Sequence, residues 1–295
     1  MTRILIAGGS GQLGRALIAH PWPDGVTTVA PTRRELDVAD ADAVKAWLRA
    51  SPVSAIINAA AYTAVDRAEI EIAAAFAANA LGPAALAEGA RAAGAPLVHV
   101  STDYVFAGDG SAPHEVDAAV APLNVYGASK AAGELAVSLG QPRSAIVRTS
   151  WLVGAGRSSF VAAMLRLARE RPVARVVDDQ HGAPTIATDL AAALATIALR
   201  MAADEAAPAG LFHFANEGDT TWHGFAAAIF AELAARGIET PRLETISSAD
   251  YGAPARRPKN SRLSTARIRR DYGVIPRPWA SALPGLIDGL LGDRT

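Results

Sequence analysis

A tyrosine and a lysine four residues apart are the most informative side chains in this sequence. Tyr126 and Lys130 stand in Tyr-Gly-Ala-Ser-Lys, in a chain of 295 residues with 5 tyrosines and three lysines. Residues four apart share one face of a helix. A neighbouring ammonium favours the ionised phenol and lowers its pKa, which makes the tyrosine a better proton donor near neutral pH. The spacing therefore predicts Tyr126 as a general acid beside Lys130.

A hydroxyl group is predicted to join this pair. Ser101-Thr102-Asp103-Tyr104 closes an apolar segment, 96–101, that is typical of a buried strand. In open α/β sheets, ligands bind beyond the carboxyl ends of the strands. Thr102 is therefore placed to hydrogen-bond a substrate carbonyl and is the third predicted catalytic residue.

A glycine-rich loop near the N-terminus predicts a dinucleotide site. Gly8, Gly11 and Gly14 follow the apolar segment 2–7 and open a helical segment, 12–20. Glycines allow a tight turn, a close backbone approach to a pyrophosphate, and close helix–strand packing. The free N–H groups at the start of the helix then favour the phosphates.

The residues after the second predicted strand, 26–30, indicate which dinucleotide is bound. An acidic residue that would hold a ribose 2′-hydroxyl is missing there, and Arg33 and Arg34 follow instead. Arginines suit a 2′-phosphate. The sequence therefore favours NADPH, with NADH as the alternative.

The elements that must position these residues alternate between strands and helices. Strands are expected at 2–7, 26–30, 55–60, 96–101 and 144–149, and helices at 12–20, 41–50, 69–93 and 126–139. Such alternation predicts an α/β fold, a doubly wound parallel Rossmann sheet with right-handed crossovers. We expect residues 1–150, together with about 175–202, to form the NADP(H)-binding domain. Residues 151–295, with helices at 187–202 and 221–236, would form a smaller, interleaved α+β substrate-binding region.

Composition excludes several other classes of protein. Hydrophobic residues make up 51% and charged residues 19%, which excludes a disordered chain. The net charge of −1 and the lack of a basic stripe give no reason to expect nucleic acid or a membrane surface as a partner. The absence of cysteine and of a secretory signal fits the cytoplasm. The six histidines show no zinc-binding spacing, and no metal site is expected.

Seven sequence strings together resemble the dTDP-4-dehydrorhamnose reductase family, in the extended branch of the short-chain dehydrogenase/reductase superfamily. They are 8–14, 58–66, 101–106, 122–127, 148–151, 179–185 and 257–263. They occur in order and cover essentially the whole chain. The resemblance implies that NADPH reduces the C4 keto group of a dTDP-4-dehydro-6-deoxy-L-sugar, the last step of dTDP-L-rhamnose synthesis. The enzyme would be an oxidoreductase that contributes to cell wall polysaccharide.

The resemblance also implies roles for individual residues. Tyr126 would protonate the C4 oxygen, Lys130 would lower the Tyr126 pKa and bind the nicotinamide ribose, and Thr102 would hold the keto oxygen. The cofactor would contact Gly8, Ser10, Gly11, Gln12, Leu13, Gly14, Arg33, Arg34, Asp37, Val38, Ala59, Ala60, Ala61, Tyr62, Tyr126 and Lys130. The sugar nucleotide would contact Thr102, Asp103, Tyr104, Asn124, Trp151, Gln180, Arg257 and Asn260. Of these, Gln180, Arg257 and Asn260 would lie at the nucleotide-diphosphate end.

One departure bears on assembly, and two alternatives stay open. Some members of the family use acidic residues for a magnesium-bridged dimer, but Arg15, Ala16 and Thr188 stand at those places here, so we expect a monomer or a weak homodimer. A nucleotide-sugar dehydratase or epimerase would share the fold, although dehydratases carry Asp-Glu after the threonine where this chain has Asp103-Tyr104. The other alternative is a non-catalytic NADP-binding subunit similar to methionine adenosyltransferase β.

Overall fold

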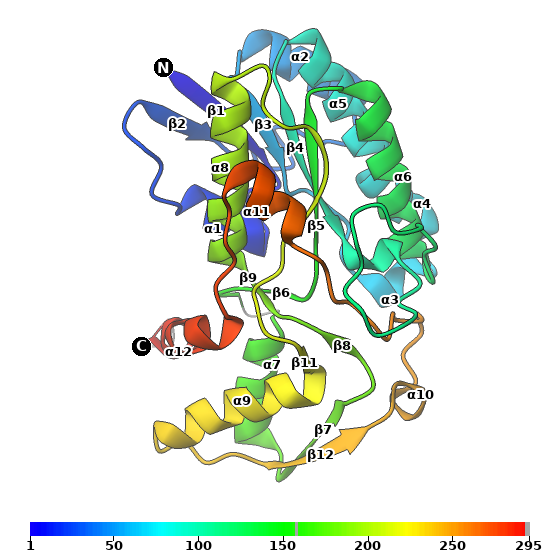
Figure 1. Cartoon of the computed structure of the whole chain (residues 1–295), viewed down its shortest axis with the longest axis vertical. Coiled ribbons are helices and arrows are strands. Elements are labelled where there is room, and N and C mark those ends of the chain that lie inside the picture. Colours follow the sequence, from blue (N-terminus) through cyan, green and yellow to red (C-terminus); the bar gives the residue numbers. More distant parts are fainter. Residues whose placement is uncertain (157–158, 293–295) are drawn as a thin grey trace.

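A six-stranded parallel sheet with helices on both faces forms the larger of two regions in the computed structural model, which describes residues 1–156 and 159–292 (Figure 1). Across the sheet the strands are β10 (Gly210–His213), β5 (Ser144–Thr149), β4 (Leu97–Thr102), β3 (Ala55–Asn58), β1 (Thr2–Ala7) and β2 (Val26–Val29). Every neighbouring pair is parallel. The order reverses between β1 and β3, which marks the switch point where such sheets bind ligands. The predicted doubly wound fold is confirmed.

Both faces of this sheet are covered, so its strands are apolar on both sides. Ile4 and Ile6 of β1 pack into the core on one face, and Leu5 packs into the core on the other. The continuous apolar strands of the sequence are the expected result. The helices on the first face are α1 (Gln12–Ile18), α8 (Ala187–Ala203) and α11 (Ala266–Tyr272), and those on the second are α2 (Ala41–Ala50), α5 (Gly82–Ala92) and α6 (Val125–Gly140).

The helix predicted over 69–93 is divided in the structure. It consists of α4 (Ile72–Phe76), a π-helical turn η1 (Ala77–Leu81), and α5, and a separate short helix, α3 (Val65–Ala68), precedes it. Pro83 explains the turn, because a proline has no N–H to donate to the carbonyl four residues earlier, which belongs to Asn79. The Asn79 carbonyl oxygen instead lies against Gly133 of α6, where an added Cβ would come within 2.1 Å of it.

Part of this segment has the length and hydropathy of a membrane span. Ile72–Ala92 is the one such stretch among the described residues. Core helices pass the same test, and Ala85, Leu86 and Ala90 of this stretch are fully or almost fully buried against the sheet. The stretch is therefore weak evidence for a membrane.

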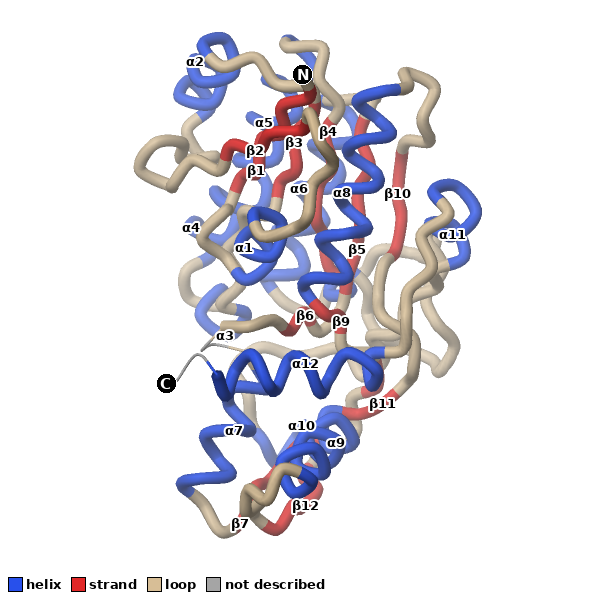
Figure 2. The backbone as a smooth tube through the Cα atoms, turned by 90° about the vertical axis from the view of Figure 1, so that its left-hand side faces the viewer, coloured by secondary structure: helices blue, strands red, loops and turns tan. Residues whose placement is uncertain are grey.

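The smaller region has its own core and its own parallel strand pair. β7 (Val173–Val177) pairs with β12 (Arg242–Ile246), and the core lies between them and α7 (Phe160–Glu170), α9 (Trp222–Ala235) and α12 (Trp279–Gly292). Figure 2 shows α12 lying across the junction of the two regions. The remaining short elements are η2 (Asp103–Val105), β6 (Leu152–Val153), β8 (His181–Gly182), β9 (Thr185–Ile186), β11 (Thr220–Thr221) and α10 (Ser248–Tyr251).

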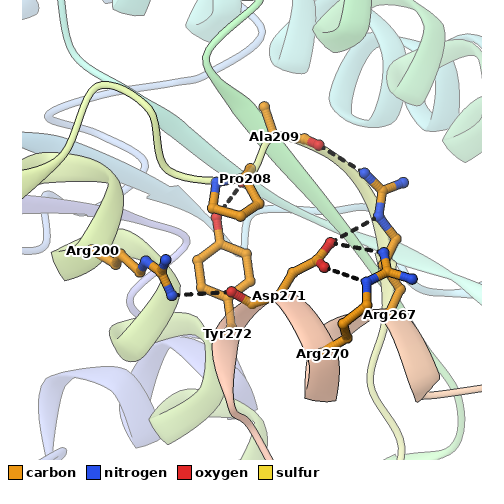
Figure 3. A network of polar contacts seen from close by, with 7 residues as sticks. All are labelled: Arg200, Pro208, Ala209, Arg267, Arg270, Asp271 and Tyr272. Carbon is orange, nitrogen blue, oxygen red and sulfur yellow. Dashed lines mark hydrogen bonds and ion pairs between the residues drawn. The ribbon is translucent and has the colours of Figure 1, made fainter.

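The C-terminal part of the chain returns to the larger region. Figure 3 shows how α11 is attached: the Tyr272 hydroxyl donates to the Pro208 carbonyl, and Arg200 of α8 donates to the Asp271 carbonyl at 3.0 Å. β10 also joins the large sheet. Neither β10 nor α11 belongs to the ranges 1–150 and 175–202 that the sequence assigns to the nucleotide-binding domain. The two regions therefore exchange more segments than predicted.

Candidate active site

Thr102, Tyr126 and Lys130 come together at the carboxyl end of the sheet. Thr102 is the last residue of β4, and Tyr126 lies in the first turn of α6. Asn124 fixes where α6 begins, because its side-chain oxygen accepts the Gly127 N–H at 2.8 Å. The predicted helix face is thereby turned towards β4.

Lys130 is buried and attached to β4. It is 2% exposed, and its Nζ donates to the Val100 carbonyl at 2.7 Å. Burial lowers the pKa of Lys130 to about 8, against the opposing effect of the nearby Glu134 carboxylate. Among the described residues Nζ has the Val100 carbonyl as its hydrogen-bond acceptor, so the ammonium has further N–H groups for a bound polar ligand.

The pKa of Tyr126 moves in the opposite direction to the one that the sequence predicts. Burial raises the pKa of Tyr126 to about 12; a hydrogen bond with Thr102 works against the rise and the charge of Asp103 adds to it. The prediction that Lys130 lowers this pKa is therefore wrong for the structure described. Desolvation of the phenol exceeds any effect of the ammonium, which is held at the strand carbonyl. Tyr126 is consequently neutral and keeps its proton at physiological pH.

Asp103 and Tyr104 surround the two hydroxyl groups. The Thr102 hydroxyl donates to Asp103 Oδ1 at 3.0 Å and accepts the Tyr104 N–H at 3.2 Å. Asp103 is 2% exposed, and burial raises its pKa to about 7 against the opposing effect of hydrogen bonds with Ser261 and Thr102. The Tyr104 ring packs edge-on against the Tyr126 ring, with centroids 5.5 Å apart. The predicted substrate residues Asp103 and Tyr104 thus lie beside the predicted acid.

The glycine-rich loop forms one wall of a cavity at the switch point. A Cβ on Gly8 would lie 2.5 Å from the Ala60 nitrogen, and one on Gly14 would lie 2.1 Å from the Gly8 carbonyl oxygen. Both positions therefore require glycine. Gly8 allows the chain after β1 to approach the chain after β3, and Gly14 allows α1 to pack against the loop. The cavity, of about 200 Å³, is lined by Gly8, Gly9, Ser10, Gly11, Pro31, Arg33, Leu36, Asp37, Val38, Ala59, Ala60, Ala61 and Ala78. Its backbone-rich floor and single arginine fit a dinucleotide.

Some of the predicted cofactor residues have other contacts. Leu13 is buried in the core, and Gln12 lines a separate cavity between α1 and α12. The Tyr62 hydroxyl donates to Glu71 at 2.5 Å. Arg34 is exposed and does not line the cavity. The side chains of these residues therefore lack the contact with the cavity that Arg33 has, and their cofactor roles stay predictions.

Arg33 lies at the mouth of this cavity with little to hold it. Its Nε donates to Asp37 at 3.1 Å, and its side chain is 82% exposed. An exposed ion pair of this kind is weak. The guanidinium is therefore available to a phosphate group at the cavity mouth.

A second cavity, of about 480 Å³, lies between the two regions. It is lined by Ala107, Gly108, Asp109, Gly110, Leu123, Gln180, Ser248, Ala249, Tyr251, Ala253, Ala255, Arg256, Arg257 and Lys259. Gln180 and Arg257, two of the predicted substrate residues, are among its lining, and their contact with a substrate stays a prediction. The Gln180 amide donates to Ser248 at 2.8 Å and accepts from Trp222 at 3.2 Å.

The other six predicted substrate residues do not line that cavity: Thr102, Asp103 and Tyr104 lie beside Tyr126, and Trp151, Asn124 and Asn260 have other contacts. Trp151 has φ of +46° and stacks on Trp222 with centroids 3.9 Å apart. Asn124 caps α6 and donates to the Arg256 carbonyl at 2.7 Å. Asn260 is 1% exposed and donates to the Ala112 carbonyl at 2.8 Å. The two asparagines hold the loops around the cavity, and their contact with a substrate stays a prediction.

Sequence reasoning assigned no role to three residues near this cavity, Asp66, Trp222 and Tyr251. Asp66 ends a string, 58–66, that supported the family resemblance, so a signal was present. Trp222 and Tyr251 stand in no recognised motif. No cluster of potential metal ligands occurs among residues 1–156 and 159–292.

The parallel sheet, the glycine-rich cavity and the group formed by the buried Thr102 and Lys130 with the half-buried Tyr126 define an enzyme of the short-chain dehydrogenase/reductase type. A family model described as the RmlD substrate binding domain matches residues 1–291, and the chain belongs to this family.

Named relatives and solved structures agree with that assignment. A dTDP-4-dehydrorhamnose reductase of Aggregatibacter actinomycetemcomitans is 40% identical over 97% of this chain and 98% of its own. One of Streptomyces griseus is 42% identical over 98% and 94%. The structure of the Bacillus anthracis dTDP-4-dehydrorhamnose reductase in complex with NADP has a TM-score of 0.89 and 34% identity, covering 98% of this chain and 99% of that one. A Streptomyces venezuelae dTDP-glucose 4,6-dehydratase, at 20% identity and a TM-score of 0.79, shows the fold alone.

Proposed function

We propose that the protein is an NADPH-dependent oxidoreductase that reduces the C4 keto group of a dTDP-4-dehydro-6-deoxy-L-sugar and yields dTDP-L-rhamnose. The observation that carries the proposal is a neutral, half-buried Tyr126 next to the buried Thr102 and Lys130, at the strand ends that also carry the dinucleotide cavity. The names of the relatives at about 40% identity supply the substrate.

NADPH, when bound, supplies the hydride that C4 receives. The residues lining the glycine-rich cavity would hold its pyrophosphate and adenosine, with Arg33 at the 2′-phosphate and Lys130 at the nicotinamide ribose. The Thr102 hydroxyl would hold the C4 oxygen. Tyr126 would donate its proton to that oxygen as negative charge develops on it.

The high pKa of Tyr126 is compatible with this role. A phenol that stays neutral delivers a proton only to a strong base, and the oxygen of a ketone undergoing reduction becomes one. Lys130, with its pKa lowered to about 8, is a buried cation that would stabilise the phenolate left behind. The environment of Tyr126 therefore disfavours ionisation before the substrate arrives.

The residue after Asp103 argues against a dehydratase. Removal of water across C5 and C6 needs a further acid and base, and dehydratases carry Asp-Glu at the place where this chain has Asp103 and Tyr104. The Tyr104 ring packs edge-on against Tyr126, and the loss of water around its hydroxyl raises the pKa of Tyr104 well above the ordinary value. A neutral phenol there is a poor substitute for a carboxylate base.

Oxidation of NADPH, followed by absorbance at 340 nm, tests the proposal. The purified protein is mixed with NADPH and a dTDP-4-dehydro-6-deoxy-L-sugar without any other protein, and the product sugar is identified. We expect turnover by the wild type and a loss of about 10²–10⁴ in kcat for Tyr126→Phe, with little change in NADPH affinity. A wild type that binds NADPH but does not turn over would favour the regulatory-subunit alternative, and a Tyr126→Phe variant above half of the wild-type kcat would refute the assignment of the acid.

The proposal extends to cofactor choice, location and assembly. NADPH is the preferred cofactor, and NADH is the alternative. The enzyme would work in the cytoplasm as a monomer or weak homodimer, independently of nucleic acid and membranes; the net charge of −1 supports only the last point, because no excess of positive charge is present to attract anionic polymers or lipids. Sedimentation velocity over a range of protein concentrations tests the state of assembly.

A further inference from the structure

Asp66 joins the nucleotide-binding region to the chain segment that crosses the substrate cavity. Its two carboxylate oxygens accept from Arg257, Oδ1 from Nη1 at 3.0 Å and Oδ2 from Nη2 at 2.8 Å. Oδ1 also accepts the Ala255 N–H at 3.2 Å. In Figure 1 the segment that carries these residues runs from α10 past α3, the helix of Asp66, and on to α11. A residue of the first region thus fixes the position of an arginine from the second.

Arg257 differs from the two other cations of the cavity lining. Arg256 and Lys259 are exposed, and Lys259 Nζ lies 3.9 Å from its nearest carboxylate, that of Asp179. Arg257 is partly buried, with a side chain 21% exposed. It is the cation of the lining that the fold holds in one orientation.

The bonds to Asp66 leave one edge of the guanidinium for a ligand. A guanidinium has five N–H groups. Arg257 uses three of them, two for Asp66 at the Nη1–Nη2 end and one from Nη1 to the Ala255 carbonyl at 3.2 Å. The Nε–H and the second N–H of Nη2 take no part in these three bonds and lie on the adjacent edge, which forms the second fork of an arginine; Arg257 also hydrogen-bonds the Tyr104 side chain, which a ligand at this fork would meet. Such a fork matches two oxygens of a phosphate.

This edge lies close to the predicted chemistry. The Arg257 side chain hydrogen-bonds Tyr104, and this bond and the charge of Arg257 offset part of the effect of burial on the pKa of Tyr104. The Tyr104 ring in turn packs on Tyr126 at 5.5 Å. An anion bound by Arg257 would therefore sit one aromatic ring away from the proton donor.

We propose that Asp66 is a positioning residue, which orients Arg257 so that its free edge binds the diphosphate of the sugar nucleotide. The inference rests on the proposed function. Asp66 itself would contact Arg257 and the Ala255 N–H, and neither the substrate nor the cofactor. Its effect is to hold a long, flexible side chain in its binding orientation before the ligand arrives, which reduces the entropy lost on binding.

Asp66→Asn is the informative substitution, because it keeps the shape of the side chain and an oxygen for the Ala255 N–H while removing the charge. Asp219→Asn is the matched control. Asp219 accepts from Arg262 of the same C-terminal segment at 2.9 Å, but neither residue lines the cavity. The control removes a similar tail-to-body ion pair without touching Arg257.

The experiment measures the Kd of dTDP by titration calorimetry, the kcat and KM of the keto sugar, and the Kd of NADPH. We expect Asp66→Asn to raise the dTDP Kd and the sugar KM about tenfold, with kcat within about twofold. The NADPH Kd should not change, and Asp219→Asn should stay within about twofold on every measure. In an Arg257→Ala background, Asp66→Asn should add nothing further, since the side chain that it positions is gone.

Several outcomes would overturn the inference. They are an unchanged dTDP Kd in Asp66→Asn, an equal loss in Asp219→Asn, a parallel loss of NADPH affinity, or an undiminished effect in the Arg257→Ala background. Failure of the proposed function is seen separately, because the wild type would then not reduce the keto sugar. The dTDP titration needs no turnover and reports on Asp66 and Arg257 in either case.

Discussion

The buried carboxyl of Asp103 should make the stability of the protein depend on pH. Burial raises the pKa of Asp103 from its ordinary value of 3.8 to about 7. The folded state therefore prefers the protonated carboxyl, whereas the unfolded chain ionises near pH 4. A raised carboxyl pKa gives a stability contribution that is complete below about pH 4, falls steadily as the pH rises, and is lost once the pH has passed about 7. Asp103→Asn, which cannot ionise, removes this dependence.

The size of the effect follows from the two pKa values. The interval from 3.8 to about 7 corresponds to about 4 kcal/mol at high pH, at about 1.4 kcal/mol per pKa unit. Between pH 5 and pH 8 the change is about 2–3 kcal/mol, because part of the loss has already occurred at pH 5. In a protein of this size it corresponds to roughly 5–10 °C in Tm.

Thermal unfolding of the wild type and Asp103→Asn at pH 5 and pH 8 measures the effect. An uncharged amide beside Thr102 has its own cost, but this cost is the same at both pH values and cancels in the comparison. We expect the Tm of the wild type to fall from pH 5 to pH 8 by several degrees more than that of the variant. Equal falls in the two proteins would show that Asp103 does not titrate in this range, and would refute the reasoning. The kcat profile gives a second test, since an ionised Asp103 raises the pKa of Tyr126 and should slow turnover above pH 7.

Two further predictions concern the cofactor side of the site. Lys130→Arg should lower kcat by about 10²-fold and weaken NADPH binding, because a guanidinium is too large for the buried position at the Val100 carbonyl; steady-state kinetics and cofactor fluorescence check this, and a fully active variant would contradict it. Replacing Arg33 and Arg34 by alanine should raise the KM of NADPH roughly tenfold at low salt, less at high salt, and leave that of NADH nearly unchanged. Equal losses with both cofactors would show that the arginines do not bind the 2′-phosphate.

Local patterns in the sequence were sufficient for the fold class and for the predicted catalytic residues. The order of β1, the glycine-rich loop and α1 could be predicted because apolar runs and glycines act over a few residues. Tyr126 and Lys130 could be paired because helical geometry brings residues four apart to one face. The same reasoning placed Thr102 at a strand end, where the structure has it.

Contacts between distant segments could not be predicted in this way. β10 has four residues and is defined as part of the sheet only by its pairing with β5. The break at η1 depends on Pro83 and on the close approach of α6, of which only the proline is visible in the sequence.

The sequence by itself determined which residues could perform the chemistry and the order of the elements that carry them, because both depend on neighbours along the chain. The tertiary structure alone decided how those residues titrate and which of them are held in place. Tyr126 has a raised pKa because packing removes water from it. Asp66 meets Arg257 across 191 residues of chain because two regions close around one cavity. Desolvation and long-range pairing are properties of the packed molecule, and a linear pattern does not contain them.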